Sequence, residues 1–94
     1  MSQQFTCDIV VSYQSETLSA KVKLLSNLPY NRFSVFFNQQ LTDLGPSHMI
    51  ISKRVTENSF HWTCEEMSYI QDESLAKKVG FEIDRYITQR NLLV

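Results

Sequence analysis

Most of the first sixty-four residues alternate between apolar and polar positions, a pattern typical of strands that bury one face. The strands that this alternation predicts are, in chain order, residues 5–13, 17–25, 32–37, 48–55 and 59–64. Only Gln14, Ser15 and Glu16 separate the first two, so these strands should form an antiparallel hairpin. Phe60, Trp62 and Cys64 share the inward parity of the last strand, which makes Trp62 a predicted core anchor.

The stretch between the third and fourth strands, residues 38–47, allows two interpretations. Asn38 tolerates a left-handed turn, so residues 40–44 could fold back as a short extra strand before Gly45 and Pro46 end it. A plain loop fits the same residues. The sheet is therefore predicted to be an antiparallel meander of five or six strands.

The period changes to that of a helix after residue 71. The apolar positions that recur at helical spacing are Leu75, Val79, Ile83, Tyr86 and Ile87. Asp72 is the predicted N-cap, with Ser68 as an alternative, and Asn91 suits the left-handed C-terminal position, from which Leu92 would pack back. Gly80 would cost about 1 kcal/mol relative to Ala inside a helix, so we expect a close approach to the sheet there.

These elements predict one α+β domain over residues 1–94, with a single C-terminal helix packed on one face of the sheet. Five strands about 4.8 Å apart span roughly 20 Å, whereas one helix is only about 10 Å across. Either the sheet curls strongly around its helix or a second chain completes the cover.

Composition narrows the functional classes. The chain has a net charge of -1, so it has no general attraction to nucleic acid or to an anionic membrane. It contains neither a secretory signal pattern nor an apolar run of membrane-spanning length, and we expect a cytoplasmic protein without membrane contact. Cys7 and Cys64 both fall on inward positions, where they should be buried, reduced thiols.

No pattern predicts a catalytic, cofactor-binding or metal site. His61 and Cys64 are three residues apart in a strand and point to opposite faces, which argues against a shared metal or a nucleophilic pair. Glu65 and Glu66 are interpreted as solvated charges. Two distant glycines exclude a glycine-rich phosphate loop. An enzyme is therefore the least favoured class.

Two surfaces could carry a binding function. The outer sheet face presents a candidate anion-binding set around Phe36, consisting of Lys21, Lys23, Arg32 and Arg54. The candidate interface set is apolar and consists of Val10, Phe36 and Ile50 on that face, with Phe81 on the helix. The leading hypothesis is a non-catalytic interaction module that self-associates as a homodimer or binds another protein. The alternative is a binder of single-stranded nucleic acid or another anionic ligand.

Overall fold

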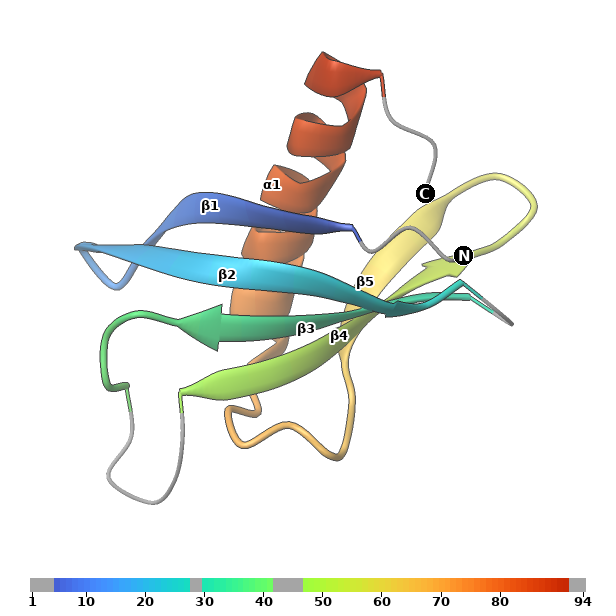
Figure 1. The fold of residues 1–94 in the computed structure, drawn as a ribbon. Helices are drawn as coiled ribbons and strands as arrows, with labels where there is room; N and C mark the ends of the chain where they lie inside the picture. The colour runs from blue at the N-terminus through green and yellow to red at the C-terminus, as the bar shows by residue number, and fades with distance from the viewer. Residues whose placement is uncertain (1–4, 28–29, 42–46, 92–94) are drawn as a thin grey trace.

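The computed structural model of the protein describes residues 5–27, 30–41 and 47–91. Its elements are β1 (Thr6–Tyr13), β2 (Glu16–Ser26), β3 (Asn31–Phe37), β4 (His48–Val55), β5 (Phe60–Cys64) and α1 (Glu73–Arg90). The strands form one antiparallel sheet in the order β1-β2-β3-β4-β5, with α1 behind it (Figure 1). The predicted α+β meander is confirmed. Gln40 and Leu41 are not in a strand, and the rest of the possible sixth strand lies outside the described residues.

The sheet curls around its helix. α1 packs against both edge strands, β1 and β5, and also contacts β4. Because these edges lie at opposite sides of the sheet, one helix can reach both only if the sheet is strongly curved. The side chains that this arrangement buries completely include Phe33, Val35, Met49, Ile51, Leu75, Val79 and Ile83. Of the two predicted ways to cover the apolar face, the structure shows the curled sheet.

The helix begins and ends where the sequence predicts. The Asp72 carboxylate accepts a hydrogen bond from the Leu75 amide at 3.1 Å and a second one from the hydroxyl of Tyr13. Asn91 has a φ of 53° and ends the helix in the left-handed conformation. Leu92, which was expected to pack back on the helix, lies outside the described residues.

The first hairpin is tighter than predicted. Its loop has two residues, Gln14 and Ser15, because Glu16 already belongs to β2. Both loop residues have positive φ values, 49° and 66°, as in a type I′ turn. Neither residue is glycine or asparagine, so the backbone is strained at both positions.

Replacing Gln14 with Asn and Ser15 with Gly should therefore raise the free energy of unfolding by about 1 kcal/mol, because these residues adopt the left-handed conformation more easily. Urea denaturation of the double variant checks this. Ser15→Val is the control, since a β-branched residue at positive φ should destabilise the protein. Equal stability of all three proteins would contradict the assigned turn.

The side chains of Phe60 and Ile50 differ from their predicted exposure. Phe60, expected in the core, is 52% exposed, because it lies next to the turn of the β4-β5 hairpin, opposite the exposed Val55. Ile50, expected on the surface, is only 8% exposed. The segment after β5 returns along β4, where the Ser68 hydroxyl bonds both the amide and the carbonyl of Ile50 at 2.8 and 3.0 Å. A segment distant in sequence therefore packs beside Ile50.

Candidate binding surface along the edge of β1

The two edge strands of the sheet differ in their protection. On β5 the amide of Cys64 donates to the carboxylate of Glu73 at 3.0 Å, so a helical side chain occupies the place of a neighbouring strand. Trp62, the central residue of β5, is only 5% exposed and lies against Gly80 of α1. The helix therefore covers the C-terminal end of the β5 edge.

The edge of β1 is open over most of its length. The Leu24 amide donates to the Phe5 carbonyl at 3.0 Å, which fixes the odd-numbered residues of this strand as those bonded to β2. The residues whose backbone groups point away from the sheet are therefore Thr6, Asp8, Val10 and Ser12, and all four are exposed. The Ser12 carbonyl accepts a hydrogen bond from Lys78 at 2.9 Å. Within the described ranges, the backbone groups of the other three have no partner.

Two hollows flank this strand. The first reaches from the outer sheet face across the start of β1 to the last turns of α1, and its lining includes Lys21, Lys23, Ser34, Phe36, Tyr86 and Arg90. The second lies between the end of β1 and the middle of α1, and its lining includes Val10, Val11, Lys77, Lys78, Phe81, Glu82 and Arg85. We call the residues around both hollows, together with the outward edge of β1, the β1 surface.

The β1 surface is basic although the chain is slightly acidic. Its positively charged side chains are Lys21, Lys23, Lys77, Lys78, Arg85 and Arg90, and its negatively charged side chains are Asp8 and Glu82. Six positive and two negative charges leave an excess of four positive charges, in a chain whose net charge is -1. The ion pairs Lys21–Asp8 and Arg85–Glu82, at 3.5 and 3.8 Å, are weak because at least one partner is exposed. A local positive field therefore remains.

The structure regroups the candidate interface residues. Val10 and Phe81, which are 56% and 64% exposed, line the same hollow between β1 and α1. Phe36 is 52% exposed and lines the other hollow. Ile50 is buried and therefore contributes no exposed side chain to an interface. Three of the four apolar candidates thus belong to the β1 surface.

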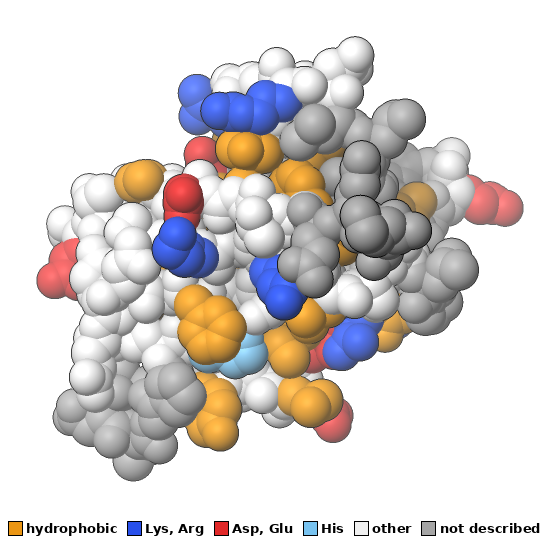
Figure 2. Space-filling model, in the orientation of Figure 1, with side chains coloured by type: hydrophobic (Ala, Val, Ile, Leu, Met, Phe, Trp, Pro, Cys, Tyr) orange, Lys and Arg blue, Asp and Glu red, His pale blue; other side chains and the backbone are white. Residues whose placement is uncertain are grey.

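The candidate anion-binding set is divided. Lys21 and Lys23 line the first hollow, whereas Arg32 and Arg54 lie outside it and have partners of their own. The guanidinium of Arg54 stacks 3.8 Å above the ring of Tyr30 and donates to its hydroxyl at 2.9 Å. Figure 2, which views the sheet from the side opposite the helix, shows basic and hydrophobic side chains interspersed, with acidic groups beside some of the basic ones.

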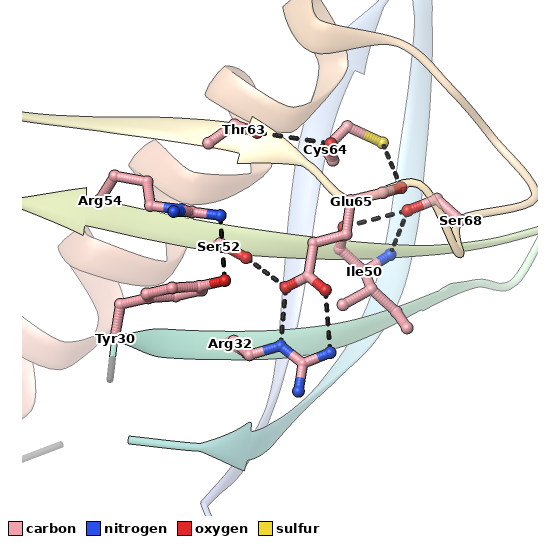
Figure 3. A network of polar contacts seen from close by, with 9 residues as sticks. All are labelled: Tyr30, Arg32, Ile50, Ser52, Arg54, Thr63, Cys64, Glu65 and Ser68. Carbon is pink, nitrogen blue, oxygen red and sulfur yellow. Dashed lines mark hydrogen bonds and ion pairs between the residues drawn. The ribbon is translucent and has the colours of Figure 1, made fainter. Parts of the chain in front are cut away.

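Glu65 holds Arg32 in a bidentate ion pair. Both carboxylate oxygens accept from the guanidinium at 2.8 Å, and the hydroxyl of Ser52 donates to the same carboxylate (Figure 3). The side chain of Glu65 is 16% exposed, so its interpretation as a solvated charge was wrong. The hydrogen bonds from Arg32, opposed by burial and assisted by Ser52, keep the pKa of Glu65 below its ordinary value. The role of this pair is structural, because it ties the segment after β5 to β3 and β4.

This ion pair predicts a dependence of stability on pH. A carboxylate whose pKa is lower in the folded state stabilises the protein above its ordinary pKa of 4.5, and that contribution is lost as pH falls through the lower, folded-state value. Glu65→Gln should cost about 1–2 kcal/mol at pH 7 and should flatten the loss of stability below pH 4.5. Urea denaturation across this pH range measures both effects.

Asp72→Asn is the matched control, because the hydrogen bond from Tyr13 also lowers the pKa of Asp72. Each substitution should remove only part of the acid sensitivity. A Glu65→Gln profile parallel to that of the parent protein would contradict the prediction.

Phe36 offers only one free ring face. Its ring stacks on the imidazole of His48 with a centroid distance of 4.1 Å and an interplanar angle of 19°. His48 is bonded in turn to the Ser34 hydroxyl at 2.8 Å, and burial lowers the pKa of this histidine. A neutral imidazole therefore supports the phenyl ring, and His48 adds no charge to the outer face at neutral pH.

Neither thiol is arranged as a nucleophile. Cys7 is buried, as predicted, and burial raises its pKa to about 11. Cys64 is only partly buried, and its Sγ lies 3.2 Å from the carbonyl oxygen of Ile70. Among the described residues, no group of three or more His, Cys, Asp or Glu side chains could hold a metal ion.

Comparisons of the chain with protein-family models, with curated proteins and with solved structures found no match. Within the described part of the chain, no helix is long and apolar enough to cross a membrane. The interpretation of function therefore depends on the geometry of the β1 surface.

Proposed function

We propose that the protein is a non-catalytic interaction module that binds an acidic segment of another protein at the β1 surface. The observation that carries this proposal is the excess of four positive charges over the β1 surface, which also carries the exposed apolar side chains of Val10 and Phe81. Apolar contacts supply binding free energy, and complementary charge supplies specificity and a faster association.

A protein ligand fits this surface better than a nucleic acid does. Arg32 and Arg54, the two arginines of the predicted anion-binding face, are already engaged by Glu65 and Tyr30. Phe36 has one ring face covered by His48, so only its other face is free to stack with a base. Unpaired backbone groups beside apolar side chains are instead suited to a polypeptide.

The proposal is tested with a fluorescent peptide of five Glu-Val repeats, titrated with the full chain at low and high salt. Lys77→Glu and Arg85→Glu should each weaken binding about five- to tenfold at low salt, because each places a negative charge beside the ligand. Arg54→Glu is the matched control, since it makes the same charge change outside the β1 surface. High salt should weaken binding to the parent protein.

Two results would contradict the proposal. One is the absence of binding by the acidic peptide at about 1 mM, a concentration that would detect even a weak interaction. The other is tight, salt-sensitive binding of an oligothymidylate that the peptide does not displace. The second result would favour the nucleic-acid alternative.

Self-association is a second candidate, favoured by the exposure of Val10 and Phe81 in one hollow. Two copies that meet through this surface would also bring two basic regions together, so their repulsion must be screened before apolar contact can form. Light scattering should then show monomers at low salt and dimers at high salt, and Phe81→Glu should abolish the dimers. Monomers under both conditions would exclude a homodimer.

A further inference from the structure

We infer that the acidic partner segment binds as an additional strand on the open edge of β1. This inference rests on the proposed function and specifies its binding mode. The segment would pair its backbone with Thr6, Asp8 and Val10, whose amide and carbonyl groups point away from β2 and have no backbone partner within the described ranges. Alternate residues of one strand lie about 6.8 Å apart, which is the repeat that an antiparallel partner requires.

The edge of β1 lacks the usual protection against such pairing. β1 has eight residues, contains no proline and has no described bulge in its register with β2. Lys78 covers the edge at its C-terminal end, where it bonds the Ser12 carbonyl. β5 has only five residues, and Glu73 covers its C-terminal end. The open part of β1 is therefore the place where the sheet can be extended.

The surroundings of this edge specify the chemistry of the ligand. Side chains of an added strand alternate between the outer face and the hollow beside α1. The hollow beside α1 contains Val11 and Phe81, so apolar residues of the segment would contact it. The carboxylates between them would lie on the outer face, where Lys21 and Lys23 flank the start of β1. The segment that fits is extended, free of proline, and composed of alternating acidic and apolar residues.

A second copy of this chain fits the edge less well. The strand that it would contribute, β1, carries Asp8 as its single charged residue. Antiparallel pairing of two β1 strands about a two-fold axis would also place two basic surfaces side by side. An acidic segment neutralises the positive charge that a second copy would double.

Amide hydrogen exchange of the full chain, free and with the peptide of five Glu-Val repeats, tests the inference. The amides of Thr6, Asp8 and Val10 should exchange quickly in the free protein and at least tenfold more slowly in the complex. The amides of Cys7, Ile9 and Val11 already bond to β2 and serve as internal references. Protection confined to the helix would overturn strand addition.

Val10→Pro gives a second, independent test. Proline removes the outward amide and is tolerated on an edge strand, so the fold should persist while peptide binding weakens at least tenfold. Val10→Thr is the matched control, because it keeps the amide and a β-branched side chain. If Val10→Pro does not fold, N-methylation of alternate residues of the peptide tests the same hydrogen bonds without changing the protein.

The outcomes distinguish the binding mode from the function. Charge-dependent binding without protection of the β1 edge, or without loss on N-methylation, would overturn strand addition but leave the proposed function intact. Failure of the charge variants to weaken binding would overturn the proposed function itself. Protection of the edge together with sensitivity to N-methylation would support both.

Discussion

Trp62→Ala should lower the free energy of unfolding by about 3–5 kcal/mol, which is a large part of the total stability of a domain of this size. The indole is 5% exposed, its ring centroid lies 5.7 Å from that of Phe33, and its Nε1 donates to Asp84 at 3.1 Å. Truncation would leave a cavity between β5 and α1 that the curled sheet cannot easily close. Urea denaturation followed by circular dichroism measures the change.

The variant Trp62→Phe distinguishes the contribution of the aromatic ring to stability from that of the indole N–H group. Phenylalanine keeps most of the apolar contact but removes the hydrogen bond to Asp84, which remains paired with Lys53 at 2.7 Å. We therefore expect a smaller loss, of about 1–2 kcal/mol. If Trp62→Ala stayed within 1 kcal/mol of the parent, the assigned packing of β5 against the helix would be incorrect.

The sequence predicts those features that depend on neighbours in the chain. Alternation identifies the five strands because every second side chain faces the same side of a sheet. The spacing of Leu75, Val79 and Ile83 identifies the buried side of the helix, and the short polar side chains of Asp72 and Asn91 identify its ends. Each of these inferences requires only a few residues.

The predictions of exposure from the sequence are wrong where a segment distant in the chain packs against the residue. Parity correctly places Ile50 on the outer side of β4, but it gives no information that a distant segment containing Ser68 packs beside this residue. Glu65 was treated as solvated because its partner, Arg32, lies thirty-three residues earlier in the chain. The side of the sheet to which a residue points can be predicted from the local pattern. Whether that residue is buried there depends on the tertiary structure.

The candidate surface shows the same limit. Val10, Phe36 and Phe81 were identified one by one as exposed apolar residues, and the structure places all three around β1. Their association with Lys78 depends on the curl of the sheet, which brings α1 to the strand edge sixty-six residues away in sequence. The spacing of Lys77, Phe81 and Arg85 at every fourth position is the signal that could have grouped the helical part.

Gly80→Ala should destabilise the protein by about 2–3 kcal/mol, although alanine is the better helix former by about 1 kcal/mol. A Cβ atom at this position would lie 2.5 Å from Cδ1 of Trp62 and closer still to Cγ and Cδ2, so the ring or the helix must move. The expected close approach of helix and sheet at Gly80 is thus confirmed. Because of this close approach, Gly80→Ala should destabilise the protein, although helix propensity alone would predict stabilisation.

A double-mutant cycle with Trp62→Ala isolates this clash. In the Trp62→Ala background the indole is absent, so Gly80→Ala should become neutral or stabilising by up to about 1 kcal/mol. Thr88→Ala, at an exposed position of the same helix, is the control for helix propensity alone. Equal effects of Gly80→Ala in both backgrounds would show that the cost does not come from Trp62. A difference of several kcal/mol between the backgrounds would establish that the absence of a side chain at Gly80 allows the helix to pack on β5.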